Sequence, residues 1–491
     1  MAAVRIIVAL SLAVLLAGLL PALPQRGGEA PGQPITGAQA RADVTGTALV
    51  RLPMRASHVA LSWADPDAGD HEGEDEDEPH ASGLSIAFSR DGRSFGEERE
   101  VLLDTHADAT DVAGLVRSGV IWTGGARFVR LTSAEPITGL TIDAIQAEAA
   151  VGGASYGPIA AAAVDQPQVI SRSGWSADES LRFWREKETP DPALVGTEKW
   201  PAEFYPIQKL IVHHTAGANN DPNPAATIRA IYYNQAISRG WGDIGYNFLI
   251  DEQGRIYEGR YSREYAAGEL PSGDDGAGKG VVGAHVGGWN SGTVGIALLG
   301  HLVSQDTTPA ARQSLEWLLA WLAERYGIDP LGGGTYTNPI DLKTRDNPNI
   351  SGHRDWAATA CPGGTFYATL PALRQAVANR IADGGTPPPP PPPPQVTVPG
   401  APALTAMTAP KRPGVRLSWT APASSGGAAV TSYRILRWNG SRFVRIATVK
   451  ASVRSFRDQR TVRGRTYRYV VRAVNRIGVS PYSNEASAAA R

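Results

Sequence analysis

Alternating apolar and polar residues predict β-structure in the first part of the chain. Short runs with this period of two are separated by Gly, Asp and Pro, which favour turns. A period of two is typical of strands that bury one face. We therefore predict a small β-sandwich-like domain over residues 41–150. The predicted strands are residues 47–52, 59–63, 84–88, 128–132 and 140–144.

The pattern changes over residues 168–382, where apolar runs alternate with stretches of helical spacing. The apolar, strand-like runs are residues 208–212, 244–250, 255–258 and 293–299. The helical stretches are residues 224–238, 309–326 and 366–381. Strands interleaved with helices favour a central sheet flanked by helices, so we predict an α/β domain here.

Eight consecutive prolines, residues 387–394, follow this domain. A polyproline II rod of that length spans about 25 Å at roughly 3.1 Å per residue. Such a rod is stiff and makes no internal hydrogen bonds, so it separates parts that fold on their own. We predict a linker over residues 383–395.

Strand patterns return over residues 396–491. The predicted strands are residues 415–419, 432–437, 443–449 and 467–474. Trp419, Tyr433, Tyr467 and the closing A-V-N motif at 473–475 resemble the pattern of fibronectin type III domains. The resemblance implies a second β-sandwich, and this fold does not by itself specify a function.

The first 30 residues have the features of an export signal. Arg5 supplies a positive charge, residues 6–20 are almost wholly apolar, and Pro21 ends the run. The alternative is an uncleaved membrane anchor, although the run is short for a full span. Both interpretations predict that the rest of the chain acts outside the cytoplasm.

Charge and cysteine content narrow the function further. The 491 residues carry a formal net charge of −1, so the basic excess of nucleic-acid-binding proteins is missing and we predict no nucleic-acid partner. The single cysteine, Cys361, excludes a disulfide within the chain. A lone cysteine in an oxidising space is either buried as a small apolar residue or protected by its function.

Two histidines and this cysteine form a candidate metal-binding set. His213 follows the apolar run 208–212, and His353 lies eight positions before Cys361. Two imidazoles and a thiolate suit zinc, and three protein ligands leave a fourth position open for water, as in catalytic zinc sites. Taken singly, such residues are more often packing or surface residues, so the residues alone leave both interpretations open.

Longer motifs surround these residues. In chain order they are I-V-H-H-T-A-G (211–217), G-W-G-D-I-G-Y-N-F-L-I (240–250) with I-Y-E-G-R (256–260), G-A-H-V-G-G-W-N (283–290), T-V-G-I-A-L-L-G (293–300), G-H-R-D (352–355) and A-T-A-C-P-G (358–363). Together they resemble the superfamily of peptidoglycan recognition proteins and phage-type amidases, in the family's order, over about residues 169–381. Six ordered motifs are far more specific than any one of them.

The resemblance implies roles for five residues. His213, His353 and Cys361 match the ligands of one zinc ion per chain. Tyr246 matches a catalytic tyrosine that hydrogen-bonds the zinc water or the developing oxyanion. Thr359 lies where the phage enzymes carry a catalytic lysine and the animal proteins carry threonine, so the group that protonates the leaving amine stays open.

The resemblance also implies a substrate groove. His285 and Asn290 match positions that line it, and Arg260 and Arg354 are further candidates. Arg354 could equally form an ion pair with the aspartate that follows it. The Gly-Trp pair that ends at Trp241 resembles the version linked, in animal relatives, to peptide stems of the diaminopimelate type.

These features predict a multidomain, secreted, cell-wall-associated enzyme that is monomeric and touches the membrane only if its first segment is uncleaved. The predicted reaction is that of a zinc-dependent N-acetylmuramoyl-L-alanine amidase, which cuts peptidoglycan between N-acetylmuramic acid and L-alanine. The alternative is a peptidoglycan-binding protein without catalysis. Family members that only bind have lost the cysteine, usually to serine, so the presence of Cys361 favours catalysis.

Overall fold

The computed structural model describes residues 34–64, 83–104, 114–148, 164–384, 398–409, 413–422, 430–475 and 477–491. The predicted export signal and the proline run lie outside these ranges. Within them, every helix is too short or too polar to cross a bilayer.

The N-terminal strands form one five-stranded sheet of order β3-β2-β5-β1-β4. Its strands are β1 (Thr36–Ala64), β2 (Leu84–Ser89), β3 (Arg99–Glu100), β4 (Leu115–Arg117) and β5 (Ile121–Gln146). Residues 141–145 of β5 pair with residues 37–41 of β1 on one side and with residues 58–62 of the same strand on the other. β5 thus pairs with β1 along both of its edges. The two long strands bend at several irregularities in their register, and the sheet curves around one apolar core. The five predicted strand segments all lie in this sheet, but a sandwich of two separate sheets is not confirmed.

The middle of the chain contains a six-stranded mixed sheet of order β15-β8-β12-β9-β10-β6. Its strands are β6 (Val169–Ile170), β8 (Lys209–His214), β9 (Phe248–Ile250), β10 (Ile256–Glu258), β12 (Thr293–Leu298) and β15 (Ile350–Gly352). Four neighbouring strands, β15, β8, β12 and β9, run parallel. Two small two-stranded antiparallel sheets accompany it: β7 (Phe204–Tyr205) with β11 (Gly280–Val281), and β13 (Gly333–Thr337) with β14 (Thr344–Pro348). The predicted α/β domain with a central sheet is therefore present.

Helices cover both faces of this sheet. Helices α2 (Pro309–Tyr326) and α4 (Leu370–Ala382) pack on one face, and α1 (Pro224–Tyr233), with the π-helical turn η3 (Asn234–Ser238), packs on the other. Short 3-10 turns are η1 (Glu179–Arg182), η2 (Pro192–Leu194) and η4 (His353–Asp355). The predicted helix 366–381 is wrong in one respect, since the structure has two helices there, α3 (Gly364–Tyr367) and α4. Pro371 in the first turn of α4 has no N–H to donate, so a helix cannot continue through it without losing a hydrogen bond.

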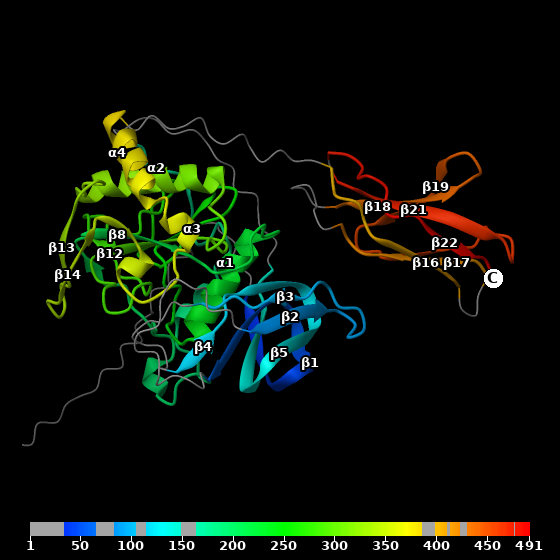
Figure 1. Cartoon of the computed structure of the whole chain (residues 1–491), viewed down its shortest axis with the longest axis horizontal. Coiled ribbons are helices and arrows are strands. Elements are labelled where there is room, and N and C mark those ends of the chain that lie inside the picture. Colours follow the sequence, from blue (N-terminus) through cyan, green and yellow to red (C-terminus); the bar gives the residue numbers. More distant parts are fainter. Residues whose placement is uncertain are drawn as a thin grey trace, which may run out of the picture.

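The C-terminal part consists of two sheets around a shared apolar core. One sheet contains β16 (Leu404–Thr408), β17 (Val415–Trp419) and β20 (Ser455–Asp458). The other contains β18 (Ser432–Trp438), β19 (Phe443–Lys450), β21 (Thr466–Val474) and β22 (Ala486–Ala489). This is the β-sandwich that the sequence predicts, and Figure 1 shows it apart from the other two sheets.

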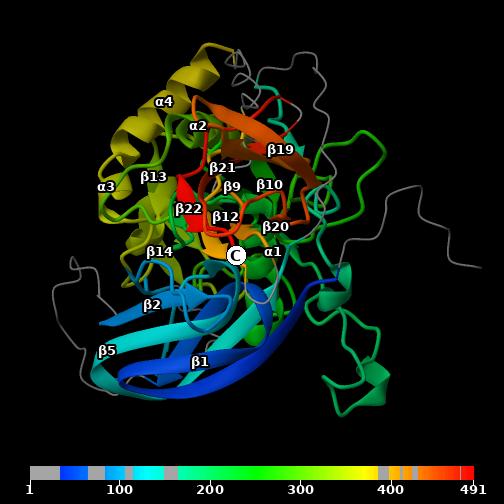
Figure 2. The same ribbon diagram turned by 90° about the vertical axis from the view of Figure 1, so that its right-hand side faces the viewer.

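The N-terminal sheet, by contrast, lies directly against α1. Figures 1 and 2 both show the blue and cyan strands beside this green helix. Ala60 of β1, together with Val120 and Ile145 of the β5 region, belongs to the same buried cluster as Ile228 and Ile231 of α1. The two parts therefore share one hydrophobic core.

Candidate functional site

Two adjacent parallel strands bring the candidate metal ligands together. His213 lies near the carboxyl end of β8, and Val212 is paired with Gly352 of β15, so His353 emerges beside His213. Cys361 follows in the next loop. The ligand atoms of the three residues all lie within 4.8 Å of one another, and all three side chains are buried.

The chemistry of this donor set fits zinc. His213 Nδ1 lies 3.7 Å from Cys361 Sγ, and the backbone N–H of His214 donates to that sulfur at 3.4 Å. Two imidazoles and one thiolate are preferred zinc ligands, and three of them leave one coordination position for water or substrate. The neighbouring His214 is not part of the set, because its Nδ1 accepts the backbone N–H of Leu302 at 3.1 Å.

His285 holds the first of these ligands in orientation. Its Nδ1 lies 3.1 Å from His213 Nε2, and its Nε2 lies 3.3 Å from Thr293 Oγ1. The Thr293 hydroxyl donates to a backbone carbonyl at 3.0 Å, so it accepts from His285 Nε2–H. His285 Nδ1 is then an acceptor for His213 Nε2–H, which leaves the lone pair of His213 on Nδ1, the atom that faces Cys361.

The surrounding backbone is shaped to hold His285. A Cβ at Gly295, on β12, would lie 2.3 Å from His285 Cγ, so only glycine fits there. Asn290 Oδ1 accepts the backbone N–H groups of His285 and Val286, each at 2.8 Å. His285 is buried. The structure thus places His285 against the candidate ligand His213, with Asn290 holding the backbone of His285. The predicted contact of both residues with substrate stays a prediction.

Tyr246 lies beside the metal ligands. Its ring centroid is 5.6 Å from that of His213, and its side chain is buried just before β9. Burial, with the negative charges of Asp104 and Cys361, raises the pKa of Tyr246 well above its ordinary value. The phenol therefore keeps its proton at neutral pH and can donate it in a hydrogen bond.

Thr359 and Arg354 hold the loop that carries Cys361. Thr359 Oγ1 accepts the backbone N–H of Cys361 at 3.1 Å. Arg354 Nη2 donates to Ala360 O at 2.8 Å, and its guanidinium lies 4.7 Å from the centre of the Tyr367 ring. These contacts fix the position of the thiol, and the predicted roles of both residues toward substrate stay predictions.

Trp241 and Arg260 lie in different surroundings. Trp241 is 9% exposed, and among the described residues its indole Nε1 has no hydrogen-bond partner. Arg260 is fully buried, pairs with Asp243 at 2.7 Å and lies 3.8 Å over the Trp200 ring. Trp241 thus has a buried donor without a partner among the described residues, whereas Arg260 is held inside the fold by protein partners, and the predicted roles of both toward substrate stay predictions.

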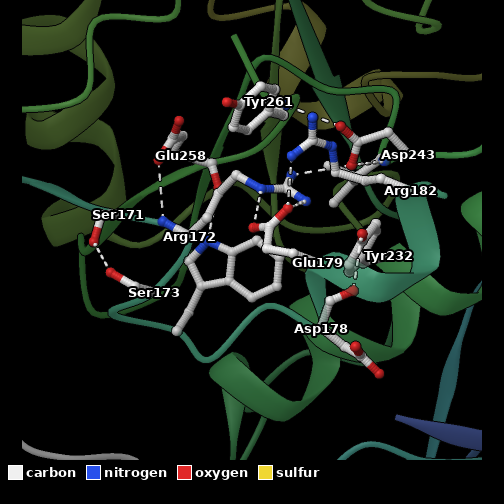
Figure 3. Close-up of polar contacts among 12 residues, drawn as sticks. Ser171, Arg172, Ser173, Asp178, Glu179, Arg182, Tyr232, Asp243, Glu258 and Tyr261 are labelled. Carbon is white, nitrogen blue, oxygen red and sulfur yellow. Dashed lines mark hydrogen bonds and ion pairs between the residues drawn. The ribbon is translucent and has the colours of Figure 1, made fainter. Parts of the chain in front are cut away.

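Arg260 belongs to a buried charge cluster, whose centre is shown in Figure 3. Arg172 Nη1 lies 3.0 Å from Asp243 and its Nε lies 2.8 Å from Glu179. Asp243 therefore joins Arg172 to Arg260. Glu258 accepts the backbone N–H of Arg172 at 3.0 Å, and burial raises the pKa of Glu258 to about 8. The cluster ties the segment after β6 to the loop before β9, which carries Tyr246.

Sequence reasoning missed three residues near the site: Thr293, Asp104 and Arg239. Thr293 opens the T-V-G-I motif, which gave a usable signal for it. Asp104 pairs with Arg239, 135 positions later, and no local pattern in the sequence indicates this pair.

Comparisons with known proteins agree with this arrangement. A family model described as N-acetylmuramoyl-L-alanine amidase matches residues 203–364, and a fibronectin type III model matches residues 400–489. Peptidoglycan recognition protein 1 of Bos taurus is 28% identical over 212 residues, which cover 43% of this chain and 85% of that protein. Peptidoglycan-recognition protein SC2 of Drosophila melanogaster is 34% identical over 164 residues, 33% of this chain and 71% of that protein. The N-acetylmuramoyl-L-alanine amidase of Homo sapiens is 28% identical over 192 residues, 36% of this chain and 28% of that protein.

These matches cover the segment that holds His213, His353 and most of the motifs around them. The fly protein is similar over more than two thirds of its own length. The chain therefore belongs to the family of peptidoglycan recognition proteins and N-acetylmuramoyl-L-alanine amidases, and it carries a fibronectin type III domain after the amidase segment.

Proposed function

We propose that this chain is a secreted, zinc-dependent N-acetylmuramoyl-L-alanine amidase that hydrolyses the amide between N-acetylmuramic acid and L-alanine of peptidoglycan. The observation that carries the proposal is the convergence of His213, His353 and Cys361, whose ligand atoms lie within 4.8 Å of one another beside the buried phenol of Tyr246. The amidase family model and the relatives named above support the same reaction and substrate class.

His213, His353 and Cys361 would hold one zinc ion per chain. When bound, zinc acts as a Lewis acid that polarises a carbonyl oxygen and lowers the pKa of a water molecule. The protein's own part is to fix the ligands. The His285–Thr293 contacts select the His213 tautomer, and the His214 N–H and the Thr359 hydroxyl fix the Cys361 loop.

Tyr246 has the clearest role toward the reacting amide. Hydrolysis adds the oxygen of water to the lactyl carbonyl carbon, breaks the bond from that carbon to nitrogen, and releases the peptide with a protonated amine. Negative charge develops on the carbonyl oxygen on the way. The protonated phenol of Tyr246 donates a hydrogen bond to that oxygen, in a buried position where such a bond is strong.

The fibronectin type III domain has a supporting role in this proposal. Its β-sandwich stands apart from the amidase segment in Figure 1. We propose that it keeps the enzyme near the polymer and so raises the local concentration of scissile bonds. The chain then works outside the cytoplasm, where peptidoglycan is found.

The deciding experiment incubates the full chain with purified sacculi, with chelator, and with chelator followed by zinc. New alanine amines and new reducing sugar ends are scored separately. We expect alanine amines that disappear with chelator and return with zinc, and no reducing ends. The Cys361→Ser chain serves as the matched control and should release none. Saturable binding of the wild-type chain to sacculi without any new ends would instead establish the recognition-only alternative.

A further inference from the structure

The N-terminal sheet is joined to the amidase domain by buried polar contacts as well as by the shared apolar core. His58 Nε2 lies 3.0 Å from Thr227 Oγ1, and Arg229 Nε donates to Ala147 O at 2.8 Å. The backbone N–H of Ile35 donates to Asp178 Oδ2 at 2.9 Å. Buried polar groups are costly when they lose their partners, so these contacts hold the sheet in one position on α1.

This position brings the sheet next to the end of β8, the strand that carries His213. A Cβ at Gly119 would lie 2.7 Å from the carbonyl oxygen of Ala216, three residues after His213. Val120 belongs to the same buried cluster as Tyr246. The segment between β4 and β5 therefore packs against the backbone that follows the first metal ligand.

One acidic residue of the N-terminal part extends this contact to the groove. Asp104 forms an ion pair with Arg239, and the two side chains are 11% and 2% exposed. The backbone N–H of Asp104 donates to Arg117 O at 2.8 Å, which fixes Asp104 on the edge of the sheet. Its carboxylate is also close enough to Tyr246 to contribute to the raised pKa of that phenol.

Arg239 in turn contacts the ring of Trp241. Its guanidinium lies 5.1 Å from the centre of the Trp241 ring, and a Cβ at Gly245 would lie 3.0 Å from the far edge of that ring. Trp241 is thus held between Arg239 and the backbone beside Tyr246. Its indole Nε1 is buried and has no hydrogen-bond partner among the described residues.

We propose that the N-terminal sheet is a wall of the substrate groove and that Asp104 is a positioning residue, which fixes Arg239 and through it Trp241 for the peptide stem of peptidoglycan. This inference rests on the proposed function, because it names the substrate of the same site. It makes the N-terminal part a component of the catalytic unit. Neither the family motifs nor the amidase match, which begins at residue 203, includes Asp104.

The test compares Asp104→Asn with the matched control Asp43→Asn in the full chain. Asp43 lies on β1 of the same sheet and accepts the N–H of Gly139 at an exposed position. With a soluble muropeptide we expect Asp104→Asn to raise KM about tenfold, because Arg239 loses the charged partner that fixes it, with kcat within about twofold. Asp104→Glu, which keeps the charge, should recover most of the loss, and Asp43→Asn should match wild type.

A binding measurement separates this inference from the proposed function. In the Cys361→Ser background, where catalysis is absent, calorimetry gives the dissociation constant for the same muropeptide with and without Asp104→Asn. We expect the same factor of about ten there. An unchanged constant and an unchanged KM in folded protein would overturn the role of Asp104. Failure of the proposed function shows instead as wild-type chain without amidase activity, and the binding comparison still decides the role of Asp104 in that case.

Discussion

His213 and His285 face each other nitrogen to nitrogen, with 3.1 Å between Nε2 of the first and Nδ1 of the second. Because Thr293 accepts from the opposite side of the His285 ring, this contact selects the tautomer of His213 and directs its lone pair toward Cys361. A metal ligand with a fixed ring orientation binds its ion more tightly than one that rotates.

Replacing His285 should therefore weaken zinc binding without unfolding the protein. For His285→Phe we expect zinc affinity, measured by competition with a chromogenic chelator, to fall by about 10- to 100-fold. His285→Gln offers a carbonyl oxygen as acceptor and should lose less. The matched control is His301→Phe, because His301 stacks on His214, which is not one of the three candidate ligands. Equal zinc affinities of wild type and His285→Phe would refute the orienting role.

Tyr246→Phe should lower kcat for muropeptide hydrolysis by about 100-fold, since it removes one donor to a developing oxyanion. Zinc content, the dissociation constant for the muropeptide and the circular dichroism spectrum should stay near wild type. A kcat within threefold of wild type would exclude the phenol from the reaction.

Glu258 should make the stability of the protein depend on pH in the neutral range. Its pKa is about 8 in the folded chain against 4.5 as the ordinary value, so the folded state retains a proton that the unfolded state has lost. Stability should fall between pH 4.5 and 8, by at most about 1.4 kcal/mol per pH unit, and level off above that range.

The Glu258→Gln variant is uncharged at every pH and isolates this effect. Thermal unfolding of both proteins is followed from pH 6.5 to 8. His58, whose pKa burial lowers to about 3, stays neutral in both proteins over that range. We expect the wild-type Tm to fall with pH relative to the variant, and parallel curves would show that Glu258 does not carry the extra proton.

Removing the fibronectin type III domain should affect large and small substrates differently. Deleting residues 383–491 leaves both faces of the amidase sheet covered by their own helices. We expect slower release of alanine amines from whole sacculi and an unchanged kcat/KM on a soluble muropeptide. Equal losses on both substrates would contradict a tethering role.

The metal set was predictable from the ordered motifs around it, because their resemblance to the amidase superfamily implies His213, His353 and Cys361 as ligands, whereas the residues alone left both interpretations open. The apolar run before His213 predicted a buried strand, but β15 and its parallel pairing with β8, which bring His353 beside His213, are seen only in the structure. The break between α3 and α4 had a local signal in Pro371, but the helical spacing of apolar residues over 366–381 continued through it and predicted one helix. The fold-back of β1 on β5 carried none, because a period of two predicts strands but does not fix which strands pair.

The Asp104–Arg239 pair could not be predicted from the sequence. Its two members are 135 positions apart and come from different sheets and helices, so only the packed chain shows that they meet. The burial of Arg260 is a related case, since nothing in its motif indicates that Asp243 and three backbone carbonyls already accept hydrogen bonds from its guanidinium.

The contact of His58 and Ala147 with α1 also determines where the chain can be truncated without exposing its core. A fragment that starts at residue 164 would expose Ile228 and Ile231. It would also remove His58 from Thr227 and the Ala147 carbonyl from Arg229. The buried cluster around α1 contains no described residue after 384, so a fragment that ends there keeps this cluster. A fusion of the amidase-family domain to a different module should therefore replace the C-terminal domain and keep the N-terminal sheet.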